Sequence, residues 1–104
     1  MANTMLAMKV AILTQFKDAV SDDISWQHII KILQNDSRLG SSHWQIPGPD
    51  GKLGFGGSCF PKDCNALLNI TDKLTILKTA VDYNNSIRAK YERSDREQKQ
   101  NITF

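Results

Sequence analysis

The sequence predicts an all-α protein of about four helices, joined by a long loop rich in glycine and proline. Apolar residues recur at helical spacing on both sides of the middle of the chain, and no stretch alternates apolar and polar residues as a strand would. All six glycines and all three prolines fall between residues 40 and 61. Together these patterns indicate helices, one unusual loop, and then further helices.

The first predicted helix spans residues 3–20 and has too many apolar side chains for one buried face. Its segment 5–13, MLAMKVAIL, is apolar all round apart from Lys9, whereas a small monomer covers only one side of a helix. A second protomer, further domains of a longer chain, or a central position in the bundle would each cover the rest. We expect this helix to form a dimer interface.

The second predicted helix spans residues 26–35, with Ser25 as its N-cap and Ile29, Ile30, Ile32 and Leu33 toward the core.

Two further helices are expected after the loop. One opens at Pro61, because proline is favoured at the first helical position. The other is capped by Thr71 or Asp72, and its apolar pattern runs from Leu74 to Tyr91. The basic stretch 88–99 is expected to be a solvated helix end or a frayed tail.

Length and composition limit the classes of protein to which the chain can belong. We expect 104 residues to form a single domain, residues 1–104. With 40% hydrophobic residues, 23% charged residues and a net charge of +2, the composition is globular and too weakly basic to indicate nucleic-acid binding. No apolar run approaches the roughly 20 residues that a bilayer requires, and no signal-peptide pattern is present. We therefore expect a cytoplasmic protein with neither a nucleic-acid nor a membrane partner.

The segment 54–63, GFGGSCFPKD, places a cysteine between a glycine-rich loop and an expected helix start. Glycines let a ligand approach the main chain closely. Unpaired amides and the positive end of the helix dipole would point toward Cys59 and favour its thiolate form. Lys62 adds a positive charge, and Asp63 supplies a carboxylate that could accept or relay a proton. A nucleophile, a cation and a base are thus close together in the sequence.

Other interpretations of these residues stay open. A single cytosolic cysteine is often a small buried hydrophobe, which is the role we expect for Cys64. His28, His43, Cys59 and Cys64 could together supply zinc ligands, but their spacing is not that of usual zinc sites, so we expect no metal. Trp44 could close a hydrophobic core or stack on a sugar or base.

Four segments in order resemble the central domain of the UDP-glucose and GDP-mannose dehydrogenase family. They are ANTMLAMKV (2–10), DSRLG (36–40), GFGGSCFPKD (54–63) and VDYNNSIR (81–88), and the GG-x-C-F-P-K-D core is distinctive. The branch that looks most similar is UDP-glucose 6-dehydrogenase. The resemblance implies an NAD-dependent oxidation of the C6 alcohol of a nucleotide sugar to a carboxylate, through a thiohemiacetal and a thioester.

The resemblance also implies roles for individual residues. Cys59 matches the cysteine that attacks the C6 aldehyde, Asp63 an aspartate that places or deprotonates water, and Asn3 an asparagine of the reacting centre. Lys62 matches a lysine near the NAD cofactor. The first helix matches the long helix through which the family forms homodimers. The family's loop that holds the sugar nucleotide matches Gly54, Phe55, Gly56 and Trp44. Arg38 matches an arginine that the family contributes across the dimer interface.

Two departures from the family pattern limit what the chain is expected to do alone. The family's catalytic lysine would precede Met1, and no GxGxxG follows a strand. We therefore expect NAD to be bound mainly by a domain that lies outside this chain, and the isolated chain to be inactive. The alternative hypothesis is a helical dimerisation module whose cysteine no longer has a catalytic role.

Overall fold

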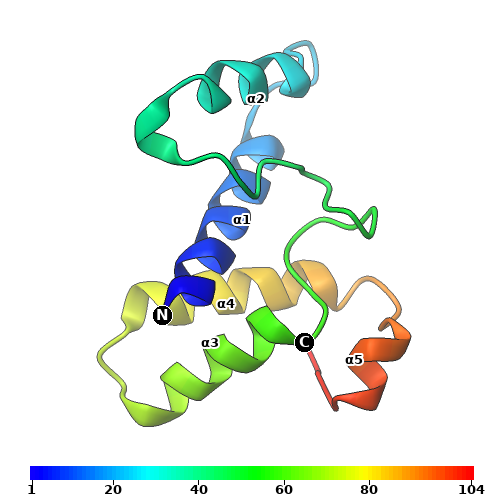
Figure 1. Ribbon diagram of the computed structural model, residues 1–104. Coiled ribbons are helices and arrows are strands. Elements are labelled where there is room, and N and C mark those ends of the chain that lie inside the picture. The colour runs from blue at the N-terminus through cyan, green and yellow to red at the C-terminus, as the bar shows by residue number, and fades with distance from the viewer.

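The computed structural model describes residues 1–104, and every regular element in it is helical (Figure 1). This confirms the all-α class. The elements are α1 (Ala2–Ala19), α2 (Trp26–Gln34), the short 3-10 helix η1 (Ser37–Leu39), α3 (Cys59–Ile70), α4 (Thr75–Arg88) and α5 (Asp95–Lys99).

Helix α1 connects the two ends of the molecule. One end of α1 lies against α3 and α4, while α2 and η1 lie at its other end (Figure 1). The loop between η1 and α3 runs back along the molecule to the start of α3 (Figure 1). None of the helices has the length and apolar character needed to cross a bilayer.

One hydrophobic core joins these elements. The buried side chains come from four helices and from the long loop, so the loop is part of the core rather than a simple linker. The members of the core are Ala7, Val10, Ala11, Leu13, Trp26, Ile30, Trp44, Ile46, Phe55, Cys64, Leu77 and Val81.

An apolar groove remains open between α1 and α4. It has a volume of about 670 Å³, and its lining includes Met5, Ile12 and Ile76. Met5 and Ile76 are 66% and 80% exposed, respectively. Residues 5–13 therefore do have a second apolar side that the rest of the chain leaves uncovered, as their composition predicts.

Helices α1 and α2 follow the sequence prediction closely, with three differences, of which the first is that α2 ends at Gln34 and not at residue 35. Ser25 is the N-cap of α2, and its hydroxyl accepts a hydrogen bond of 3.2 Å from the His28 amide. Helix α1 runs one residue earlier than predicted. The prediction for Ile32 was wrong, because this side chain is 59% exposed while Ile30 is 6% exposed. Residues two apart point to opposite sides of a helix, so both cannot face one core.

The start of α3 and the start of α4 were also predicted incorrectly. Helix α3 begins at Cys59 rather than at Pro61; proline fits in the first turn because its missing N–H would have no partner there. Helix α4 begins at Thr75 with no side-chain cap. The Thr71 hydroxyl instead accepts a hydrogen bond of 3.2 Å from the Lys73 amide within the connecting turn.

The segment 88–99 is not a frayed tail. It turns back after α4 and forms α5, with Ser94 and Glu97 forming a capping box. The Ile102 amide donates to the Glu97 carbonyl at 2.9 Å, and both side chains are buried. The C-terminal segment therefore folds against the glycine-rich loop.

Candidate active site

Three predicted site residues lie at the starts of α1 and α3. The Asn3 side-chain amide donates a hydrogen bond of 2.8 Å to the Asp63 carboxylate. Asp63 lies one helical turn after Cys59, so both side chains project from the same side of α3. The fold thus places an amide, a carboxylate and a thiol around the first turns of one helix.

The two cysteines have opposite environments. Cys59 is exposed at the first position of α3, where the backbone amides have no partner within the helix. Cys64 is completely buried in the core, as predicted. Burial, together with the negative charge of Asp63, raises the pKa of the Cys64 thiol to about 11. Only Cys59 is therefore accessible as a nucleophile.

The backbone of the glycine-rich loop is held by side chains of the protein itself. The Phe55 amide donates to Asn84 Oδ1 at 2.7 Å, and Asn84 Nδ2 donates to the Phe55 carbonyl at 3.0 Å. A Cβ atom added to Gly54 would lie 2.5 Å from Asn84 Oδ1. The close approach for which Gly54 is needed is thus made by a buried asparagine of α4.

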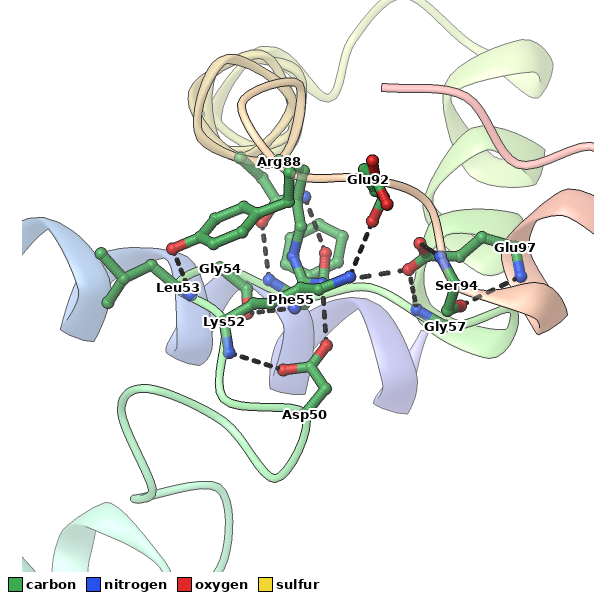
Figure 2. A network of polar contacts seen from close by, with 12 residues as sticks. Asp50, Lys52, Leu53, Gly54, Phe55, Gly57, Arg88, Glu92, Ser94 and Glu97 are labelled. Atoms are coloured by element: carbon green, nitrogen blue, oxygen red, sulfur yellow. Dashed lines mark hydrogen bonds and ion pairs between the residues drawn. The ribbon is translucent and has the colours of Figure 1, made fainter.

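Ion pairs continue this arrangement along the loop (Figure 2). Arg88 lies between two carboxylates, with Nη1 2.8 Å from Asp50 Oδ2 and 3.9 Å from Glu97 Oε2. Arg88 Nη2 donates to the Gly54 carbonyl at 3.0 Å, and the Gly57 amide donates to Glu97 Oε2 at 2.7 Å. The loop is therefore anchored at both of these glycines.

The charge of Glu97 is stabilised although the side chain is only 2% exposed. Burial by itself raises the pKa of this carboxyl group. Hydrogen bonds from the Ser94 and Gly57 amides, and the positive charges of Arg88 and Lys52, outweigh that effect and lower the pKa below its ordinary value. Glu97 is therefore ionised at neutral pH.

A cavity of about 530 Å³ opens beside the glycine-rich loop. Its walls combine backbone from the loop with aromatic and basic side chains, and Phe60, the residue after Cys59, is one of them. The other main lining residues are His43, Trp44, Gly54, Phe55, Gly56, Gly57, Arg88 and Arg96.

Trp44 closes the core and also lines this cavity. Its side chain is 5% exposed, and its indole N–H donates to the Gly40 carbonyl at 3.1 Å. Lys9 Nζ lies 3.8 Å from the centroid of the Trp44 ring, a distance at which a cation is attracted to the ring face. The indole is therefore fixed in place, with its core-closing role visible in the structure.

The side chains of two predicted site residues are not bonded to the other predicted site residues. Arg38 is on η1, where it pairs with Asp36 at 2.6 Å and remains 84% exposed. Lys62 is exposed on α3. No side-chain hydrogen bond or ion pair within this chain joins Arg38 or Lys62 to Cys59, Asn3 or Asp63. No group of three or more histidine, cysteine or acidic side chains has the arrangement of a metal site.

Sequence reasoning missed the side chains that hold the loop. In the sequence, Asn84 falls within the apolar helix pattern that runs from Leu74 to Tyr91, and Arg88 and Glu97 fall within a segment expected to be solvated. One available signal was Ser94-Asp95-Arg96-Glu97, a capping-box pattern that indicates a helix start. The burial of Glu97 has no local signal, because it depends on how α5 packs against the loop.

Comparisons with known proteins show which family the chain belongs to. Residues 1–86 match the UDP-glucose/GDP-mannose dehydrogenase family, central domain. The chain is 30% identical over 95 residues to UDP-glucose 6-dehydrogenase YwqF of Bacillus subtilis, covering 85% of this chain and 20% of that protein. It is 32% identical over 87 residues to a UDP-glucose 6-dehydrogenase of Rhizobium meliloti, covering 83% of this chain and 17% of that protein. No solved structure matches the chain.

The chain therefore spans about a fifth of the length of these relatives. Because the family match extends over most of its residues, the chain belongs to the UDP-glucose/GDP-mannose dehydrogenase family, of which it contains the central domain.

Proposed function

We propose that this chain is the central domain of an NAD-dependent UDP-glucose 6-dehydrogenase and that Cys59 is its covalent nucleophile. The observation that carries the proposal is the position of Cys59. It is an exposed thiol at a helix start, one turn from a carboxylate that is itself held by Asn3. The names of the two relatives support UDP-glucose as the substrate and its oxidation at C6 as the reaction.

The bonds that form and break at the Cys59 sulfur can be written step by step. The Cys59 thiolate adds to the carbonyl carbon of the C6 aldehyde, a C–S bond forms, and the carbonyl oxygen takes up a proton to give a thiohemiacetal. Oxidation of the adduct to a thioester would require NAD, presented from outside this chain, to take the C6 hydride while the hydroxyl proton is lost to solvent. Water then attacks the thioester carbonyl carbon, the C–S bond breaks, and the thiolate leaves. The product is the uronate.

Asp63 and Asn3 are suited to the hydrolytic step. A carboxylate one turn from the thiol can accept the proton that water loses as it attacks the thioester. The Asn3 amide donates to that carboxylate at 2.8 Å, which fixes its orientation. We assign proton transfer to Asp63 and the orientation of Asp63 to Asn3.

NAD does not fit the described residues by themselves. The chain is entirely helical, whereas dinucleotides are usually held at a glycine-rich turn between a strand and a helix. The cofactor would be presented by another domain or chain, with Lys62 near it. Gly54, Phe55, Gly56 and Trp44 would contribute to holding the sugar nucleotide.

We further propose that the chain forms a homodimer through the groove between α1 and α4. Exposed Met5, Ile12 and Ile76 supply an apolar surface there, and covering such a surface with a second copy removes it from water. Arg38, which is 84% exposed on η1, would then be free to contribute to the site of the partner subunit.

The C6 aldehyde of UDP-glucose tests the nucleophile without NAD. We would label C6 with ¹³C and follow the aldehyde carbon by NMR after adding millimolar compound to the chain. A thiohemiacetal signal is expected with the unmodified chain and with Cys64→Ser, and it should be absent with Cys59→Ser. An equal signal in Cys59→Ser, or none in the unmodified chain, would leave the non-catalytic dimerisation module as the better hypothesis.

A further inference from the structure

Arg88 and Glu97 form a buried pair beside the glycine-rich loop (Figure 2). Their side chains are only 3% and 2% exposed, with Arg88 Nη1 3.9 Å from Glu97 Oε2. Each also bonds to the loop backbone, Arg88 to the Gly54 carbonyl at 3.0 Å and Glu97 to the Gly57 amide at 2.7 Å. We call these two residues and their bonds to the loop the Arg88–Glu97 clamp.

Both members of the clamp are themselves fixed. Glu97 Oε1 accepts a hydrogen bond of 2.9 Å from the Ser94 amide, so each carboxylate oxygen has a backbone donor. Arg88 Nη1 is 2.8 Å from Asp50 Oδ2. Side chains held at several points lose little further freedom when they bind the loop, so the clamp can impose a fixed backbone geometry.

The loop conformation depends on this support. Gly54 and Gly57 both have positive φ values, 79° and 76°, a region in which the backbone is readily altered in glycine. Between them, a Cβ on Gly56 would lie 2.5 Å from Arg88 Nη1. The clamp therefore packs directly on the loop and bonds to the backbone of both Gly54 and Gly57.

The loop leads directly into the nucleophile. Ser58 is the N-cap of α3, and its side chain makes no capping hydrogen bond. The start of the helix is therefore not held by a side-chain cap. The nearest fixed point before Cys59 is the bond from Gly57 to Glu97. Because Arg88 and Glu97 both follow residue 86, the last that matches the family, this support comes from the C-terminal segment.

We propose that Arg88 and Glu97 are positioning residues, which hold the Gly54–Gly57 backbone so that α3 begins at Cys59 and its free amides stabilise the thiolate. This inference rests on the proposed role of Cys59. If the clamp is loosened, the first turn of α3 frays, the thiolate loses its stabilising amides, and Cys59 reacts more slowly.

Two substitutions with opposite charge effects separate positioning from simple electrostatics. In a Cys64→Ser background, Glu97→Gln removes a negative charge, and Arg88→Met removes a positive one. If only electrostatics mattered, Cys59 would be alkylated faster in Glu97→Gln and more slowly in Arg88→Met. Positioning predicts slower alkylation by iodoacetamide at pH 7 in both, by about three- to tenfold, the scale of one lost hydrogen bond. Asp82→Asn and Lys78→Met, an exposed pair on the same helix, are matched charge controls.

Amide hydrogen exchange supplies a second readout. In Glu97→Gln the Gly57 amide should exchange about tenfold faster because its charge-assisted bond is weakened, while the Phe55 amide, held by Asn84, keeps its protection. If Arg88→Met fails to fold, Arg88→Lys takes its place, since lysine keeps the charge but cannot reach Asp50 and Gly54 with one planar group.

The outcomes are distinct. Unchanged or faster Cys59 alkylation in folded Glu97→Gln, or equal loss of protection at Gly57 and Phe55, would overturn the positioning role. Failure of the proposed function has a different signature. The unmodified chain would then alkylate Cys59 no faster when folded than when unfolded in urea, while the exchange result at Gly57 would still report on the clamp.

Discussion

The side-chain amide of Asn3 donates a hydrogen bond of 2.8 Å to the carboxylate of Asp63. The two residues are far apart in the sequence, and their contact ties the first turn of α1 to the helix that begins at Cys59. A helix start, a thiol and an oriented carboxylate are thereby combined in one place. The same contact also makes the site sensitive to changes in α1.

Replacing Asn3 should show how much the Asn3–Asp63 hydrogen bond contributes to the unfolding free energy. Asn3→Leu removes a donor to a charged group, which is expected to cost about 1.5–3 kcal/mol of unfolding free energy. Asn3→Asp places a second carboxylate against Asp63. The loss of unfolding free energy in this variant should be larger at pH 7 than at pH 4, where one carboxyl group can be protonated. Urea unfolding at both pH values measures this. Asn65→Asp, at an exposed position of α3, is the control, and an equal pH dependence there would contradict the prediction.

Alanine substitutions distinguish a loop glycine that packs against buried side chains from one that does not. A Cβ on Gly56 would meet Arg88 and Glu97, whose charged ends are buried and cannot move into solvent. Gly56→Ala should therefore cost about 1–3 kcal/mol. In Gly48→Ala the nearest atom outside the neighbouring residues, Asp50 Oδ1, lies at 3.5 Å, an ordinary contact, and little loss is expected. Thermal unfolding compares the two variants, and equal stabilities would show that the clamp does not pack on Gly56.

Stability should fall in acid because of Glu97. The pKa of Glu97 is lowered in the folded protein. Burial raises it, but the hydrogen bonds from the Ser94 and Gly57 amides and the charges of Arg88 and Lys52 outweigh that effect. A lowered folded pKa contributes stability that is fully present above the unfolded value of 4.5 and is lost as the pH falls through the folded value. Urea titrations between pH 6 and pH 3 should show this loss. The unfolding free energy should depend less steeply on pH in Glu97→Gln than in the unmodified chain. Identical slopes would contradict the pKa direction.

A charge placed in the apolar groove should prevent dimerisation. Ile76 is 80% exposed and lines the groove, so Ile76→Lys would bury an unpaired charge in the proposed interface. Ile70 is 76% exposed at the end of α3, outside the groove, so Ile70→Lys is the control. In sedimentation velocity at high micromolar concentration, the unmodified chain and Ile70→Lys should be dimers and Ile76→Lys a monomer. A monomeric unmodified chain would refute the proposed interface.

Local patterns in the sequence were enough for the helical class and for the pairing of cysteine with a helix start. The N-cap at Ser25 and the interior position of Cys64 follow from residue preferences that depend on few neighbours. The beginning of α3 at Cys59 rather than Pro61 was missed because proline is tolerated anywhere in the first turn. The side of α2 that Ile32 occupies could not be chosen while all four apolar residues were assigned to one face.

The support of the glycine-rich loop depends on contacts that no local pattern encodes. Gly54 and Gly56 were interpreted as freeing the backbone for a ligand, whereas Asn84, Arg88 and Glu97 fill the space beside them. Glycine allows close approach by any group, so the sequence alone does not distinguish a substrate from a side chain of the same protein. Only the packing of α4 and α5 against the loop makes that distinction.

The alkylation rate of Cys59 at pH 7, measured in folded and urea-unfolded chain, tests the activated thiol most directly. Each modified cysteine is located by peptide mass spectrometry. If the helix start stabilises the thiolate, Cys59 should react several-fold faster in the folded chain, while Cys64, buried and with its pKa raised to about 11, should react only after unfolding. A folded Cys59 that reacts at the unfolded rate or more slowly would contradict its assignment as the nucleophile.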